Sequence, residues 1–143
     1  MTDIQDRDNF ALWTTGRAGS ELFTPTTERW KPIPGHGGDY EVSNLGRVRS
    51  HKGRRVQIIK QAVAATGYRR LTLSRNGVHT SRSVHQLVLE AFVGPRPDGM
   101  VTRHLNDVPY DNRLENLTWG TRAENEDDKR RNGGTQRLLR RNR

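Results

Sequence analysis

The chain has 143 residues, a length that suits one compact domain or two very small ones. Hydrophobic residues make up 31% and charged residues 29%, so any core is small, and the formal net charge of +9 favours an anionic partner such as nucleic acid. We expect no membrane span and no signal peptide, because no apolar run is long enough; the absence of cysteine excludes disulfides and agrees with a reducing cytoplasm.

The charge is divided unevenly along the chain. Residues 29–82 contain twelve basic and two acidic side chains, whereas residues 84–128 contain four basic and nine acidic ones. Residues 129–143 are basic again, with seven cations and no carboxylate. An acidic segment between basic ones repels DNA unless a cation lies in it, so the pattern favours a nuclease over a simple basic binding domain.

Residues 1–27 predict a weakly ordered leader, because Gly16, Gly19 and Pro25 interrupt any long element. The next segment, 28–83, predicts a small antiparallel β-sheet. Its clearest part is a hairpin in which residues 40–43 and 47–50 alternate apolar and polar side chains.

The turn of this hairpin contains Gly46 at a strained position, and Val48 then faces the core. Residues 56–59 predict a further strand and 62–67 a connector. Asn76-Gly77 predicts a tight turn between two more strands, 68–75 and 78–83.

Basic side chains gather on the outward face and at the turns of this sheet. They form the candidate DNA-contacting set: Arg47, Arg49, Lys52, Arg54, Arg55, Arg69, Arg70 and Arg75. A β-ribbon that carries arginines is one way into the DNA major groove. The alternative is a solvated basic face that binds phosphates without choosing bases.

Residues 84–93 predict a helix with Leu87, Val88, Ala91 and Phe92 on one face. His85, near its start, is interpreted as a structural hydrogen-bond partner, because a lone histidine has that role more often than a catalytic one.

Two short strands follow, one that contains His104 among the apolar residues Met100, Val101 and Leu105, and one at 117–119. Thr121 and Glu124 then form the pattern of a capping box at the start of a helix. This helix has almost no apolar stripe, and it contains Asn125, a poor residue for a helix interior. Asn125 is therefore interpreted as a functional residue.

Beyond this helix, residues 133–143 predict a basic tail that becomes ordered with DNA, with Gly133-Gly134 as a hinge.

The stretch Arg103-His104-Leu105-Asn106-Asp107, the run Asp111 to Leu117, Trp119-Gly120-Thr121 and Glu124-Asn125 resemble the HNH nucleases. The closest likeness is to the phage homing endonucleases in which the last histidine is asparagine. The helix at 84–93 resembles the one that leads into this motif.

Residues 30–35 and 40–50 resemble the small modular domain that recurs beside HNH nucleases in homing endonucleases, which implies a DNA-contacting role. Together the resemblances imply an α+β fold, with a small antiparallel β-sheet domain at 28–83 followed by a ββα-metal (HNH) nuclease module at 84–132. They also imply a monomer that acts on double-stranded DNA, in the cytoplasm of a host cell for a phage-encoded enzyme.

Hydrolysis of a phosphodiester needs a base for the attacking water and a cation near the phosphate. We assign His104 as the base, Asn125 as the ligand of a divalent cation, Mg²⁺ or Mn²⁺, and Asn116 as the residue that holds His104 in place. Arg103 departs from the family, where the residue before the base commonly ligates the metal. Either Asp107 or another carboxylate takes its place, or Asn125 binds the metal nearly alone, with waters and phosphates. Phosphate contact and a structural ion pair stay open for Arg103. A DNA-binding protein that has lost catalysis remains the alternative to an endonuclease.

Overall fold

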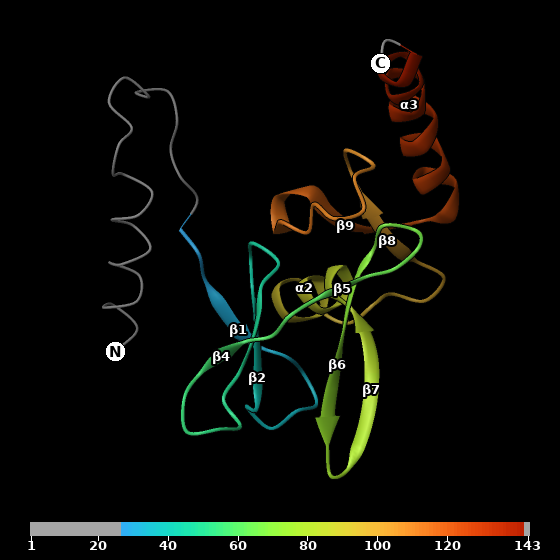
Figure 1. Ribbon diagram of the computed structural model, residues 1–143. Coiled ribbons are helices and arrows are strands. Elements are labelled where there is room, and N and C mark those ends of the chain that lie inside the picture. Colours follow the sequence, from blue (N-terminus) through green and yellow to red (C-terminus); the bar gives the residue numbers. More distant parts are fainter. Residues whose placement is uncertain (1–26, 142–143) are drawn as a thin grey trace.

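The computed structural model describes the backbone of residues 27–141 and the side chains of residues 27–133 (Figure 1). The predicted leader lies outside this part, apart from Thr27. An antiparallel sheet is built from β1 (Trp30–Pro32), β2 (Tyr40–Ser43), β3 (Val48–Ser50) and β4 (Gln57–Ile58), in that order. A second antiparallel sheet consists of β5 (Ala62–Val63), β6 (Arg69–Arg75) and β7 (Val78–Ser83).

The single sheet predicted for 28–83 is therefore two sheets. The expected connector also contains a strand, because Ala62 and Val63 pair with Arg70 and Arg69. Strand β4 is too short to continue the pairing, and the chain crosses to the second sheet directly after it. The Gln61 amide, which donates to the Gly46 carbonyl at 2.8 Å, holds this crossing in place.

Both predicted turns are confirmed. The amide of Gly46 donates to the Ser43 carbonyl at 3.0 Å, and the φ of Gly46 is 86°, a left-handed value that glycine adopts without strain. In the β6–β7 hairpin, Asn76 and Gly77 both have positive φ, as the tight two-residue turn requires.

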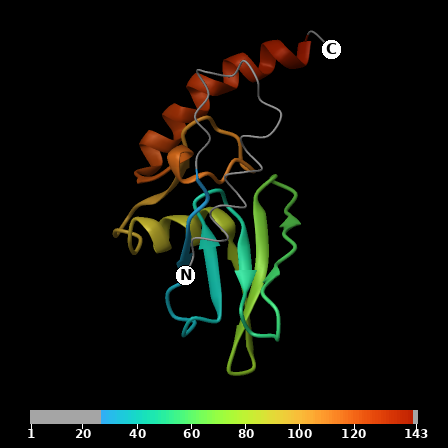
Figure 2. The same cartoon turned by 90° about the vertical axis from the view of Figure 1, so that its left-hand side faces the viewer.

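Helix α2 (Val84–Phe92) confirms the predicted helix and lies between the two sheets and the C-terminal elements. Figure 2 shows the sheets on one side of α2 and the last helix on the other. One hydrophobic core joins both predicted domains without a break at residue 84. Its buried members are Ile33, Tyr40, Val42, Val48, Leu71, Leu73, Val84, Leu87, Val88, Leu89 and Leu117.

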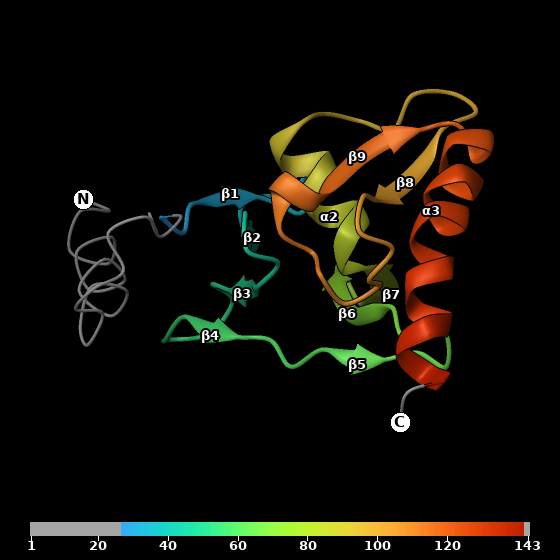
Figure 3. The ribbon, with the colours of Figure 1, turned by 90° about the horizontal axis from the view of Figure 1, so that it is seen from above.

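The C-terminal part contains β8 (Val101–His104), the short helix η1 (Leu114–Asn116), β9 (Leu117–Gly120) and α3 (Arg122–Arg141). Strands β8 and β9 pair antiparallel, and α3 lies along β8 (Figure 3). Among the described helices, none is long and apolar enough to cross a membrane.

The start of α3 is the predicted capping box. The Glu124 amide donates to Thr121 Oγ1 at 3.1 Å, and the Thr121 amide donates to Glu124 Oε1 at 2.9 Å. The predicted hinge at Gly133-Gly134 is wrong, because α3 continues through both glycines to Arg141. Just before them, Asn132 Nδ2 donates to the Leu105 carbonyl at 3.3 Å and so ties the helix to the loop after β8.

Candidate active site

Strands β8 and β9 and helix α3 form the unit that positions His104. His104 is the last residue of β8 and pairs with Leu117, while Thr102 pairs with Trp119. Alternation along the strand places Thr102 and His104 on one face and Arg103 on the other. The predicted strand–loop–strand–helix order is confirmed, so the base candidate and Asn125 belong to one compact unit.

The His104 ring is fixed by a hydrogen bond that sequence reasoning missed. Its Nε2 lies 2.9 Å from Oδ1 of Asn112, and both side chains are buried. An amide oxygen accepts a hydrogen bond, so Nε2 carries the hydrogen and Nδ1 is the basic nitrogen of the neutral ring. Burial lowers the pKa of His104, and the contact with Asn112 opposes part of that effect. The ring is therefore neutral at pH 7 and can accept a proton.

The side-chain hydrogen bonds of Asn116 go to the loop and not to the His104 ring. Its Oδ1 accepts from the Asn106 amide at 3.1 Å, and its Nδ2 donates to Asn106 Oδ1 and to the Asp111 carbonyl, each at 2.9 Å. Asn116 thus fixes the loop on which Asn112 lies. Both asparagines occupy one short loop, and the sequence carries no signal that tells which of them faces the histidine.

The N-terminal module packs against the loop that contains Asn112. A Cβ at Gly46 would lie 2.9 Å from Cβ of Asn112, so only glycine allows this approach. The Leu114 amide donates to the Asn44 carbonyl at 2.8 Å. The loop that carries the partner of His104 is thereby set against the first sheet.

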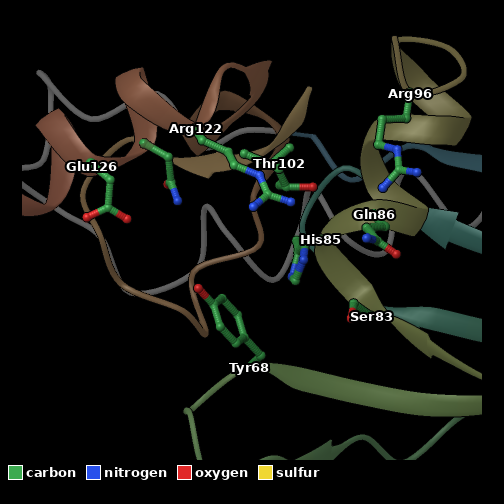
Figure 4. Close-up of a pocket in the computed structure, with 10 residues that line it drawn as sticks. Tyr68, Ser83, His85, Gln86, Arg96, Thr102, Arg122 and Glu126 are labelled. Carbon is green, nitrogen blue, oxygen red and sulfur yellow. The ribbon is translucent and has the colours of Figure 1, made fainter. Parts of the chain in front are cut away.

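A cavity of about 440 Å³ opens between α2, β8 and α3. Asn125 from α3 lines it, together with Thr102, His85, Tyr68 and Arg122. Figure 4 shows these walls, with Arg122 and Thr102 facing His85 across the opening and Tyr68 at its edge. The lining is mainly polar and cationic, which suits a phosphate group more than an apolar ligand.

Three rings pack beside this cavity. The His85 ring meets the His104 ring edge-on at 5.1 Å between centroids, and Tyr68 lies 5.2 Å from His85 and 5.7 Å from His104. His104 is thus held between Asn112 and an aromatic wall. Burial, and then the proximity of His104 and Arg70, lower the pKa of His85 to about 4.

The contacts of Arg103 are those of an ion pair. Its Nε and Nη2 donate to the Asp128 carboxylate at 2.7 and 3.0 Å, and its Nη1 lies 3.1 Å from Glu124. Only 1% of the Asp128 side chain and 15% of the Arg103 side chain are exposed. The guanidinium faces α3, and the alternative of a structural ion pair matches these contacts better than phosphate contact does.

The predicted DNA-contacting residues divide into two groups. Arg49 is buried, stacks on Trp30 with 4.1 Å to the ring centroid, and pairs with Glu41, so its predicted outward position is wrong. The Arg49 guanidinium covers the indole ring of Trp30, a contact that the alternation of side chains along the strand does not predict. Arg47 is exposed but paired with Glu28.

The remaining members lie toward solvent. Lys52, Arg54 and Arg55 lie on the exposed loop 51–56, with the Lys52 ammonium near the Ser74 oxygens. On the second sheet, Arg69 is half-buried, Arg70 bonds to Ser81 and Ser83, and Arg75 contacts the Gly35 carbonyl.

Two neighbouring residues of α3, Asn125 and Glu126, bring an amide and a carboxylate group to this cavity, and Lys129 Nζ lies 3.1 Å from Glu126 Oε1. In the part of the chain that the structure describes, no group of three or more His, Asp or Glu side chains is placed to hold a metal. The Asn125 amide oxygen lines a cavity with room for several waters, which fits Mg²⁺, a cation that keeps its waters and binds through one or two protein ligands and substrate phosphates. The nearby carboxylate of Asp128 is engaged by Arg103.

Comparison with known proteins identifies both halves of the chain. Residues 28–74 match the NUMOD4 motif, and residues 82–127 match the HNH endonuclease family model. The chain therefore belongs to the HNH endonuclease family, with a NUMOD4 module before the HNH module.

The chain is similar to the DNA endonuclease I-HmuI of Bacillus phage SP01, with 34% identity over 96 residues that cover 67% of this chain and 54% of the relative. It is also similar to an uncharacterized HNH endonuclease of Acanthamoeba polyphaga mimivirus, with 35% identity over 103 residues that cover 69% and 25% of the two chains. The match thus spans about half of the first relative and a quarter of the second.

Among solved structures, the chain resembles that of the HNH homing endonuclease I-HmuI, a protein that binds and cleaves DNA. The TM-score is 0.66 and the identity 30%, over 78% of this chain and 66% of that one. This likeness confirms the predicted α+β fold.

Proposed function

We propose that the chain is a metal-dependent DNA endonuclease of the homing type that hydrolyses phosphodiester bonds, with His104 as general base. The observation that carries this proposal is the buried Asn112–His104 hydrogen bond beside a cavity that Asn125 and Arg122 line. The relative I-HmuI is a DNA endonuclease, and we propose double-stranded DNA as the substrate of this chain.

His104 performs the proton transfer. Asn112 keeps the hydrogen on Nε2, so Nδ1 takes the proton of the attacking water. The imidazolium that forms is stabilised by the charges of Asp111 and Asp107, which favour the charged ring. Asp111 remains a carboxylate, because hydrogen bonds from Arg113 above all lower its pKa to about 2.

Asn125 is the protein ligand that we propose for the cation, and Mg²⁺ is the cation that we propose. A bound cation would offset charge on the phosphate and on the leaving oxygen. Arg122 and Arg96 line the cavity and bind the anionic backbone of DNA there.

DNA contact is proposed for the NUMOD4 side of the molecule, residues 28–83, and the nuclease reaction for residues 84–132. Lys52, Arg54 and Arg55 on the exposed loop are the foremost candidates for phosphate contact, and the basic segment 133–143 adds sequence-independent attraction. We further propose a monomer that acts on phage or host DNA in the cytoplasm of an infected cell.

A plasmid assay tests the activity. The full chain is incubated with supercoiled plasmid and Mg²⁺, and nicked and linear products are followed with time. We expect products that EDTA abolishes, and a rate at least about 10²-fold lower in His104→Ala. His79→Ala, at an exposed histidine on β7, is the matched control and should cut normally. Plasmid binding without any cut would instead establish a DNA-binding protein that lacks catalysis.

A further inference from the structure

The wall of the active-site cavity contains polar atoms that have no partner. Nδ1 of His85 and Oγ1 of Thr102 are shut off from solvent, and neither makes a hydrogen bond in the described part of the chain. They come from different elements, α2 and β8, and both residues line the cavity that also contains Asn125. Buried polar atoms without partners are uncommon in folded proteins, and each calls for an explanation such as a catalytic role or a bound water or ion.

The surroundings of the two His85 ring nitrogens indicate which of them carries the hydrogen. No hydrogen bond to its Nε2 is found among the described residues, and Nε2 is not shut off from solvent as Nδ1 is, so Nε2 is the nitrogen that a ligand can reach. The ring is neutral at pH 7, since burial lowers its pKa to about 4. A neutral imidazole carries one hydrogen, and an unpaired buried N–H is disfavoured more than an unpaired acceptor. The hydrogen therefore belongs on Nε2, where it is available to a ligand.

The neighbours of His85 indicate what that ligand is. Its ring touches the ring of His104, the base. The cavity also presents two guanidinium groups, Arg96 and Arg122, and one carboxylate, Glu126, which is paired with Lys129. A donor among cations, beside the base, is suited to an oxygen of a phosphodiester.

A phenylalanine at position 85 would fill the same place without an unsatisfied nitrogen, so the fold gains nothing from the imidazole as such. This contrasts with Arg103, whose donors are directed to carboxylates and not to the cavity.

We propose that His85 is a further catalytic residue, which donates a hydrogen bond from Nε2 to the DNA phosphate that is cut. This inference rests on the proposed function and deepens it, because it adds a second histidine to the site. The interpretation of His85 as a structural partner is thereby replaced, since no described residue accepts or donates a bond to it.

Substitution of His85 tests the proposal. His85→Phe keeps the shape and edge-on packing of the ring but removes the donor. We expect an unchanged or higher Tm, plasmid binding within a few-fold of wild type, and a cleavage rate lower by at least about tenfold, as for loss of one donor to a transition state. His85→Gln restores an N–H donor and should recover part of that rate. His79→Phe, at an exposed position on β7, is the matched control and should change neither the plasmid binding nor the cleavage rate.

Wild-type cleavage by His85→Phe would overturn the proposal while leaving the proposed function intact. If His85→Phe has a lower Tm than wild type, NMR of the wild-type chain tests the proposal instead. Long-range ¹H–¹⁵N spectra of the wild-type chain should show the Nε2–H tautomer of His85. Its Nε2 resonance should shift when a short DNA duplex is added in EDTA, whereas the ring of His79 stays unmoved. An Nδ1–H tautomer, or a His85 signal that DNA leaves unchanged, contradicts the assignment. These spectra decide about His85 even if the wild-type chain cuts no plasmid, an outcome that would refute the endonuclease itself.

Discussion

Replacement of Arg103 by methionine is the most direct test of how β8 and α3 are joined. Methionine keeps an unbranched apolar stem but removes the guanidinium that spans Asp128 and Glu124. Among the described residues, the Asp128 carboxylate, with 1% of its side chain exposed, then keeps the ion pair with Arg131, whose side chain is 71% exposed. A buried carboxylate would thus lose its fixed partner.

Loss of one member of a buried ion pair costs about 3–5 kcal/mol, and the remaining contact with Arg131 reduces this to about 2–3 kcal/mol for Arg103→Met. For a folded unit of this size, that corresponds to a fall of about 10 °C in Tm. Urea unfolding at pH 7 of Arg103→Met, Asp128→Asn and the double variant measures it. The double variant should be less destabilised than the sum of the two single ones, since the second substitution removes a charge that is already unpaired.

The pH dependence supplies an independent check. Hydrogen bonds from Arg103 lower the pKa of Asp128 below its ordinary value of 3.8. The stabilisation is therefore complete above pH 3.8 and is lost as the pH falls through the lowered pKa, so the gap between wild type and Arg103→Met should narrow in acid. DNA affinity should stay within a few-fold. If Arg103→Met melts like wild type but binds DNA tenfold more weakly, the residue is a phosphate contact and the ion-pair interpretation is refuted.

Three further outcomes follow from the site. The acid limb of the cleavage-rate profile should have its midpoint below pH 6.5, because burial lowers the pKa of His104, and a midpoint above 6.5 would contradict the buried environment. Asn112→Ala should slow cleavage about 10–100-fold at unchanged DNA affinity, whereas Asn116→Ala should chiefly lower Tm, as rates and calorimetry would show. Gly120→Ala should cost about 1–3 kcal/mol in urea unfolding, since its Cβ would overlap the Arg103 stem, and Arg103→Ala should relieve that cost.

The features that sequence reasoning predicted correctly have local causes. The Asn76-Gly77 turn requires two positive φ values in succession, and few residue pairs other than Asn-Gly adopt them readily. The capping box of Thr121 and Glu124 depends on residues three apart, so it forms once the helix begins there.

The errors have non-local causes. Arg49 occupies a strand position that alternation places outside, but Trp30 of the neighbouring strand needs a cover and the guanidinium supplies it. Asn112 and Asn116 differ in role only through the path of a loop that residues far away in sequence hold. Gly133 was expected to interrupt α3, yet the Asn132 contact with the loop after β8 holds the helix directly before it.

The error over Asn112 and Asn116 lies at the contact between the two halves of the chain, and this bears on how the nuclease module works. Gly46 lies against Asn112, Tyr68 lies against the rings of His85 and His104, and a Cβ at Gly67 would lie 2.9 Å from Cγ of Pro109. The NUMOD4 side therefore supplies part of the support that fixes the base. The core that runs through α2 then joins the proposed DNA-contacting loop and the proposed catalytic site in one packed body, because the sheets that carry the basic loop also support the partner of His104.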